Sequence, residues 1–201
     1  MTTIGSLFSG VGGIELGLER GIAGSKTIWQ VEMDPFCQRV LARNWPHAEL
    51  FDDVNKVGKQ NLSQVDIICG GFPCQGFSVS GKMEGLENEK SNLWWQCHRI
   101  IRELRPRVVL LENTPALLVR GALDVFGSLA EIGYDAEWST VTASSVGAPH
   151  RRERVFIVCY PAPGSDKGRS PADAHHGYAE DAVPAGRQTA PVHGAQDGEQ
   201  F

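Results

Sequence analysis

The sequence predicts an α/β fold with a mostly parallel sheet and helices on both of its faces. Up to about Tyr160, short apolar runs alternate with stretches whose apolar residues recur at helical period, which is typical of βαβ units. Hydrophobic residues make up 41% of the 201-residue chain, enough for one globular core. After Tyr160, Pro, Gly, Ala, His, Ser and Asp dominate. We therefore expect one domain over residues 1–160 and an irregular or disordered tail over residues 161–201.

The first half of the chain is expected to contain three strands and two helices. The run TIGSLFS favours a strand, and GIELGLERGI favours a helix that opens after a Gly-rich turn. A second helix follows TIWQVEM, because Phe36, Val40 and Leu41 recur near helical period. In chain order the expected elements are strand 3–9, helix 13–22, strand 27–33, helix 34–46 and the buried strand 65–71.

The second half is expected to add two helices and three strands. NLWWQCHRIIRELRP has the apolar spacing of an amphipathic helix and stops at Pro106. ALDVFGSLAEIG predicts a helix with Gly133 in the usual place for a C-cap. The expected elements are helix 92–106, strand 107–113, helix 122–133, strand 136–144 and strand 154–160.

Charge and cysteine usage limit the classes of function. The net charge is −5, so DNA binding would need a local patch such as Arg151, Arg152 and Arg154, or a partner surface. The five cysteines include no CxxC pair, which disfavours a disulfide framework or a zinc site. No apolar run reaches 18 residues and no signal peptide opens the sequence, so we expect a cytoplasmic protein without a membrane span.

A glycine turn follows the first predicted strand. LFSGVGGIELG places Gly10, Gly12 and Gly13 before the helix, where glycine lets a ligand approach the backbone closely. Such a turn alone is equally consistent with a purely steric role. Glu32 lies 20 residues after Gly12, at the end of the second strand, where an acid binds ribose hydroxyls in nucleotide sites. Asp53 is a candidate acceptor for an adenine amino group, or else a solvated loop carboxylate.

GGFPCQGFS, residues 70–78, presents one thiol in a rigid and sterically open loop. Pro73 fixes its own φ and restricts the residue before it, while the surrounding glycines clear space around Cys74. Most free cysteines are small buried hydrophobes, and Cys69, Cys97 and Cys159 fit that description. Cys74 instead has the surroundings of an exposed nucleophile, whose reactive form is the thiolate.

A carboxylate and two arginines complete the candidate residues. Glu112 ends the apolar strand VVLLEN, and an acid in that position needs a partner or a chemical role. Arg152 and Arg154 are two residues apart as the last strand begins, so both side chains can point to one face. The alternative for this stretch is a pair of surface arginines, bridged to Glu153 and its neighbours.

Taken in order, these motifs resemble the DNA (cytosine-5)-methyltransferase family. The resemblance rests on LFSGVGGIELGL, VEMDPFCQRVLARNWP, FDDV, GGFPCQGFSVSGK, LLENT and VGAPHRRERVFIV, and it covers most of residues 4–160. It implies a Rossmann-like fold that uses S-adenosylmethionine, with residues 1–160 as the catalytic domain. It also implies double-stranded DNA as substrate, with the target cytosine flipped out of the stack.

The resemblance assigns a role to each candidate. Cys74 would attack C6 of cytosine, Glu112 would contact N3 and the exocyclic amine, and Arg154 would hold the O2 side. Arg152 would contact phosphate or support the loop, and Pro73 would orient the thiol. In the cofactor site, Glu32 would bind ribose, Met33 would pack on adenine, and Asp53 would meet the adenine amino group. The turn itself would be lined by Phe8, Gly10 and Gly12.

The sequence departs from the family in length. Family members continue with a target-recognition domain and a last motif that completes the cofactor pocket, and neither is found in residues 161–201. We therefore expect a catalytic portion that ends early or that works with a second chain supplying target recognition. The alternative is an inactive subunit that binds cofactor or a partner chain.

Overall fold

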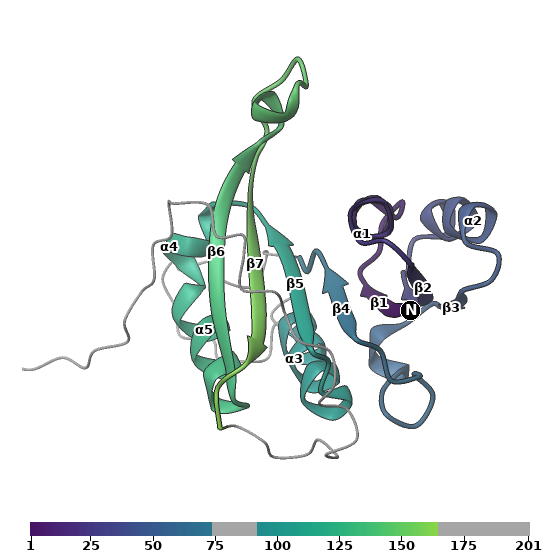
Figure 1. Cartoon of the computed structure of the whole chain (residues 1–201), viewed down its shortest axis with the longest axis horizontal. Helices are drawn as coiled ribbons and strands as arrows, with labels where there is room; N and C mark the ends of the chain where they lie inside the picture. The colour runs from purple at the N-terminus through teal and green to yellow at the C-terminus, as the bar shows by residue number, and fades with distance from the viewer. Residues whose placement is uncertain (74–91, 165–201) are drawn as a thin grey trace, which may run out of the picture. The chain divides into compact units, whose positions relative to one another are not determined.

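The structure is a computed structural model that describes residues 1–73 and 92–164 (Figure 1). Residues 74–91 and 165–201 lie outside the described part, and they include Cys74 and nearly all of the expected tail. The division into a domain at 1–160 and a tail at 161–201 therefore stays a prediction.

Within residues 1–73 and 92–164, seven strands form one sheet in the order β3-β2-β1-β4-β5-β7-β6. The first five strands are mutually parallel, whereas β7 runs antiparallel to both β5 and β6. The start of β7 consequently lies at the same edge of the sheet as the end of β5. The predicted α/β fold with a mostly parallel sheet is confirmed. The strands are β1 Thr2–Leu7, β2 Ser25–Val31, β3 Glu49–Phe51, β4 Ile67–Gly70, β5 Val108–Asn113, β6 Tyr134–Thr142 and β7 Glu153–Pro161.

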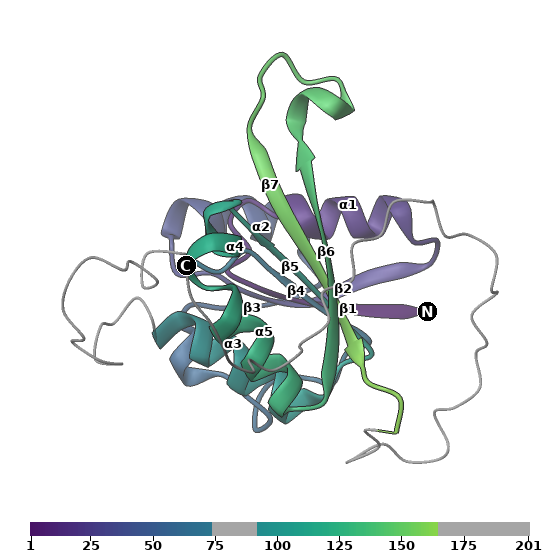
Figure 2. The same cartoon turned by 90° about the vertical axis from the view of Figure 1, so that its left-hand side faces the viewer.

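Helices cover both faces of the sheet, α1 and α2 on one face and α3 and α5 on the other (Figure 2). The start of α2 follows local rules: Pro35 occupies the first turn, and the Asp34 side chain accepts a hydrogen bond from the Cys37 N–H at 2.9 Å. The helices are α1 Gly13–Gly21, α2 Pro35–Asn44, α3 Asn92–Leu104, α4 Ala116–Arg120 and α5 Ala122–Glu131, with short 3₁₀ turns η1 Val54–Lys56 and η2 Ala143–Val146.

Apolar side chains pack into two clusters, because successive residues of a buried strand point to opposite faces. In β4, Ile67 and Cys69 belong to a small cluster with Ile14 and Leu18 of α1. Ile68 belongs to the large cluster on the other face, which α3 and α5 close; it includes Trp94, Ile100, Ile101, Val109, Leu111, Val125, Leu129 and Ile157. Because the strands are buried on both faces, the positions of their ends, which carry the candidate residues, are fixed relative to one another.

The hairpin of β6 and β7 runs beyond the ends of the neighbouring strands and carries η2 near its tip (Figures 1 and 2). Its residues Ser144 to Gly147 and Pro149 to Arg152 are exposed. Among the residues that the structure describes, no helix combines the length and apolar character needed to cross a bilayer.

Candidate active site

The described candidate residues gather at one edge of the sheet. Gly10 and Gly12 follow β1, Glu32 follows β2, and Asp53 follows β3. Glu112 lies near the end of β5, and Arg152 and Arg154 flank the start of β7. The carboxyl ends of parallel strands are where α/β sheets bind ligands. The antiparallel direction of β7 adds the two arginines to this edge.

The turn after β1 has an unusual backbone. Phe8, Gly10 and Gly12 all have positive φ, of 55°, 55° and 85°. Phe8 is not glycine, so its conformation is strained and has to be held by its surroundings. The Gly12 N–H donates to the carbonyl of Ser9 at 2.9 Å, which closes the turn. A Cβ added at Gly10 would meet no atom of residues 1–73 or 92–164 within 4 Å, so this part of the chain leaves open space beside the backbone for a ligand.

Glu32 ties this turn to the loop after β2. Its Oε2 accepts from the Gly10 N–H at 2.7 Å, and its Oε1 accepts from the Asp34 N–H at 2.8 Å. A carboxylate offers about four acceptor positions, so capacity remains for ligand hydroxyls. Met33, the next residue, is 77% exposed and offers an apolar surface at the same rim.

Asp53 already has partners in the chain. Its side chain accepts hydrogen bonds at 2.9 Å from the backbone N–H and the side-chain amide of Asn55, and Lys56 lies 3.6 Å away. The Asn55 backbone hydrogen bond is the main cause that lowers the pKa of Asp53. The Glu32 N–H donates to the carbonyl of Phe51 at 3.0 Å and joins the ends of β2 and β3. Glu32 and Asp53 therefore follow adjacent strand ends.

Glu112 is paired with an arginine at the end of β5. Arg154 Nε lies 2.6 Å from Glu112 Oε1, and the two side chains are 24% and 25% exposed. The geometry thus brings together two of the predicted residues, which are 42 positions apart in the sequence. Gly71 makes room for the carboxylate, since a Cβ there would lie 2.8 Å from Oε2.

Asn113 anchors the loop that leads to Cys74, a role that sequence reasoning missed. Its Nδ2 donates to the carbonyl of Phe72 at 2.9 Å, and Phe72 is only 2% exposed. Pro73 follows on the exposed side of this anchor, next to the end of β5. The only advance signal was the position of Asn113 in LLENT. Cys74 itself lies outside the described residues, so its role stays a prediction.

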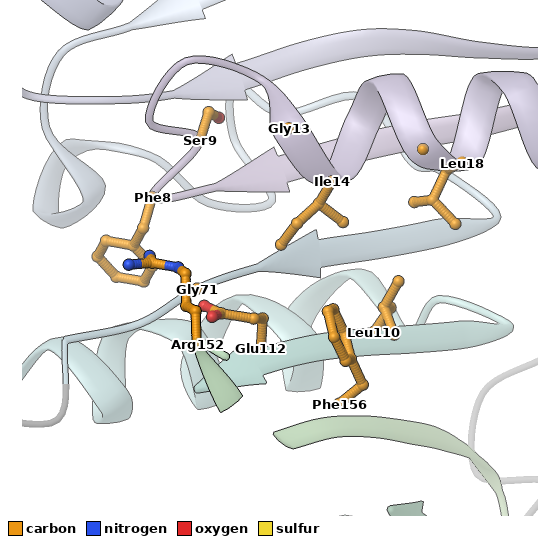
Figure 3. Close-up of a pocket in the computed structure, with 11 residues that line it drawn as sticks. Phe8, Ser9, Gly13, Ile14, Leu18, Gly71, Leu110, Glu112, Arg152 and Phe156 are labelled. Carbon is orange, nitrogen blue, oxygen red and sulfur yellow. The ribbon is translucent and has the colours of Figure 1, made fainter. Parts of the chain in front are cut away.

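A cavity of about 590 Å³ connects the turn to the carboxylate. Figure 3 shows Phe8, Arg152 and Glu112 grouped at one end, with apolar side chains from α1 and the sheet along the rest. Both arginines therefore lie close to Glu112. Arg152 lines the same cavity as Glu112, and Arg154 pairs with it directly. The lining residues are Phe8, Ser9, Gly13, Ile14, Gly17, Leu18, Gly71, Leu110, Glu112, Arg152 and Phe156.

The described cysteines are poor nucleophiles. Cys69, Cys97 and Cys159 are buried, and desolvation raises the pKa of each thiol, that of Cys159 to about 12. Burial disfavours the thiolate because the charged form loses its hydration. Cys37 is half-buried, and desolvation raises the pKa of its thiol as well. Cys69, Cys97 and Cys159 thus behave as small buried packing residues, as the sequence predicted.

Comparison with known proteins supplies the family. The profile of C-5 cytosine-specific DNA methylase matches residues 2–181. The Type II methyltransferase M.HhaI of Haemophilus parahaemolyticus is 33% identical over 158 residues, which are 77% of this chain and 47% of that protein. The Type II methyltransferase M.CviJI of Paramecium bursaria Chlorella virus IL3A is 40% identical over 154 residues, 76% of this chain and 41% of that protein. The chain thus spans less than half the length of these curated relatives.

Solved structures agree on the fold. A DNA modification methyltransferase encoded within an E. coli prophage is 29% identical, with a TM-score of 0.66. The match covers 80% of this chain and 47% of the prophage protein. The DNMT2 of Spodoptera frugiperda, at 22% identity, has a TM-score of 0.68 over 80% of this chain and 50% of its own, and shows the fold alone. The fold is that of the S-adenosylmethionine-dependent methyltransferases. With 180 of its 201 residues matched by the family profile, the chain belongs to the C-5 cytosine-specific DNA methylase family.

Proposed function

We propose that the protein transfers a methyl group from S-adenosylmethionine to C5 of cytosine in DNA. The observation that carries this proposal is the Arg154–Glu112 pair, in which Nε lies 2.6 Å from Oε1. The Glu112 carboxylate lies beside Gly71, three residues before Cys74 in the sequence. Family membership and the glycine turn at the same sheet edge support it. The Type II methyltransferases among the relatives fit a role in restriction–modification, and the proposal includes a cytoplasmic location.

In this proposal different side chains contact different atoms of the cytosine ring. The Cys74 thiolate forms a bond to C6, which breaks the aromaticity of the ring and makes C5 nucleophilic. Glu112 contacts N3 and the exocyclic amine, and so relieves the negative charge that builds on the ring. Arg154 holds the O2 side and Pro73 orients the thiol. Once C5 is methylated, loss of the C5 proton expels Cys74 and restores the base.

The residues beside the glycine turn suit an adenosyl cofactor. Open space beside Gly10, the carboxylate of Glu32 and the exposed side chain of Met33 provide backbone access, a hydroxyl acceptor and an apolar contact. Asp53 would accept from the adenine amine, and Phe8 and Gly12 would shape the turn. When bound, S-adenosylmethionine supplies the electrophilic methyl group that C5 accepts.

Double-stranded DNA is the proposed macromolecular substrate, with the target cytosine flipped out because C6 is unreachable inside a stacked duplex. The chain carries a net charge of −5, so phosphate contacts have to be local. Arg151 and Arg152 are exposed on the projecting hairpin and offer such contacts.

Methyl transfer is tested directly with tritium-labelled cofactor and cytosine-containing DNA. The full chain should label C5, Cys74→Ala should abolish labelling, and the matched variant Cys37→Ala should retain it. Glu112→Gln should reduce the rate by about 10²-fold or more, as expected for a group that manages charge in the transition state. Equal labelling by the chain and by Cys74→Ala would refute the covalent mechanism.

A second candidate function is that of a subunit that binds cofactor and a partner chain, and the surface of α1 favours it. A Cβ added at Gly13 or Gly17 would meet none of the described residues within 4 Å, so the described part of the chain leaves the helix backbone uncovered beside the apolar residues Ile14 and Leu18. We assign to this face a second chain that supplies target recognition. Cofactor binding in calorimetry without a DNA gel shift would favour this function, and sequence-selective DNA binding by the chain alone would eliminate it.

A further inference from the structure

Trp45 lies against the backbone of the glycine turn. A Cβ added at Gly12 would come within 2.3 Å of the Trp45 ring atom Cζ3 and 2.4 Å of Cη2. The indole thus occupies the space that any side chain at this position would need. Gly12 has a φ of 85° at the N-terminus of α1, so the ring packs on the point where the turn becomes a helix.

Trp45 is itself held in place from three directions. Its side chain is buried, with only 6% of the residue exposed. Its backbone N–H donates to the carbonyl of Leu41 at 2.7 Å and ends α2. Its indole Nε1–H donates to Glu19 Oε2 at 3.1 Å, while Glu19 Oε1 accepts from the Thr27 N–H at 2.8 Å. The carboxylate therefore joins the indole to β2.

The spacing of these residues explains the arrangement. Glu19 follows Gly12 by seven residues, about two helical turns, so both lie on one face of α1. The indole contacts this face at two points: its Nε1–H donates to Glu19, and its outer ring atoms pack against Gly12. On the far side of the turn, Gly10 donates its N–H to Glu32 at 2.7 Å. The turn is thus held at Gly10 by a hydrogen bond and at Gly12 by a packed ring.

We propose that Trp45 and Glu19 are positioning residues for the cofactor turn. The indole, oriented by Glu19, keeps Gly12 in its left-handed conformation before any ligand binds. The turn then loses its conformational entropy when the protein folds. Cofactor binding is therefore not weakened by the entropic cost of ordering the turn. The first part concerns the chain alone, whereas the consequence for affinity rests on the proposed function.

Two variants weaken the contacts that hold the indole. Trp45→Phe lacks the N–H donor and also the outer ring atoms Cζ3 and Cη2 that approach Gly12. Glu19→Gln replaces one carboxylate oxygen with an NH₂ group, so the side chain can no longer accept from both the indole N–H and the Thr27 N–H. Trp138→Phe, a partly buried Trp→Phe change in the edge strand β6, is the matched control. At the glycine amides the double variant should be no worse than Trp45→Phe alone, because Trp45→Phe already removes the ring contact through which Glu19 acts on the turn.

Amide hydrogen exchange of the full chain without ligand tests the first part. In both variants the Gly10 and Gly12 amides should exchange about three- to tenfold faster, the range expected for one lost hydrogen bond, while core amides of β5 stay unchanged. Trp138→Phe should leave both glycine amides as they were. A uniform rise across the protein would mean ordinary destabilisation and would overturn the proposal, as would unchanged glycine amides.

Calorimetric titration with S-adenosylmethionine and S-adenosylhomocysteine tests the second part. The dissociation constant should rise about three- to tenfold in both variants and stay constant in the control. Faster exchange at the turn with unaltered affinity would overturn the positioning role. If the unaltered chain binds neither compound, the proposed function fails, and the exchange data alone still decide whether Trp45 holds the turn.

Discussion

Replacing Gly12 with alanine should destabilise the protein more than replacing Gly10, and the comparison isolates the contact with Trp45. Both glycines have positive φ, 85° and 55°, so alanine costs about 1–2 kcal/mol at either position. Both replacements also reduce the freedom of the unfolded chain, by a similar amount. Of these two glycines, Gly12 has a described neighbour in the way, whereas a Cβ at Gly10 would meet none of the residues that the structure describes within 4 Å.

The size of the difference follows from the distance to the indole. Ordinary contact begins at 3.4 Å and the Gly12 Cβ would lie 2.3 Å from Trp45, so ring and backbone must separate by 3.4 − 2.3 = 1.1 Å. Overpacking of this kind costs about 1–3 kcal/mol. Gly12→Ala should thus lower the free energy of unfolding by about 3 kcal/mol, and Gly10→Ala by about 1.5 kcal/mol. The corresponding falls in Tm are roughly 6–12 °C and 3–6 °C.

Urea unfolding followed by circular dichroism measures both values, and a third protein checks the cause. Trp45→Leu removes the ring atoms that approach Gly12 and keeps an apolar side chain. In that background Gly12→Ala should cost no more than Gly10→Ala costs in the unaltered chain. The reasoning is refuted if the two alanine variants are equally stable, or if the excess cost of Gly12→Ala persists in the Trp45→Leu protein, where the indole is gone.

Three further predictions concern the site, α3 and the hairpin. Gly71→Ala requires Glu112 Oε2 to move from 2.8 Å to at least 3.4 Å, a shift of 0.6 Å, and should lower methyl transfer about tenfold. The control Gly127→Ala, which meets nothing within 4 Å, should retain full activity, and equal rates would contradict the role of Gly71. Burial lowers the pKa of His98 below its ordinary 6.5, so only the unfolded chain gains a proton just below that pH. The free energy of unfolding should therefore fall on acidification through pH 6.5, by at most about 1.4 kcal/mol per pH unit, and His98→Gln should lose this contribution; identical pH slopes in urea unfolding would contradict it. Arg151 pairs with Glu153 at 3.0 Å and its side chain is 81% exposed, so it can turn from this partner to a DNA phosphate. Arg151→Ala should therefore reduce the salt slope of log K for DNA binding by about one, and an unchanged slope would rule the contact out.

The sequence predicted secondary structure well wherever apolar residues recur with a single clear period. The β4 run from Ile67 to Cys69 and the helix from Asn92 to Leu104 were predicted within two residues at each end, because burial on one or two faces leaves a clear apolar pattern. Strand β3 and helix α4 were missed. Glu49–Phe51 has three residues and Ala116–Arg120 has five, too few for a period to be recognised.

The contacts between site residues were harder to predict than the identity of those residues. The sequence singled out Glu32 and Glu112 as acids at strand ends, and both are found there. It did not indicate that Glu32 already accepts two backbone N–H groups, or that Arg154 pairs with Glu112. Trp45 lies 33 residues after Gly12, and no local pattern connects them. Such contacts depend on which strands are neighbours, and the sequence alone did not define the strand order.

The direction of β7 is the topological feature on which the candidate site depends. This strand has nine residues, so its two ends are eight steps of 3.3 Å, about 26 Å, apart. Were β7 parallel to β5, its first residues would lie at the opposite edge of the sheet, roughly 26 Å from their present position. In the antiparallel arrangement Glu112 pairs in register with Phe156, and Arg154 Nε reaches the carboxylate at 2.6 Å. Parallel strands thus place the carboxylates at their carboxyl ends along one edge of the sheet. Arg152 and Arg154, at the start of β7, reach that same edge only because β7 runs in the opposite direction.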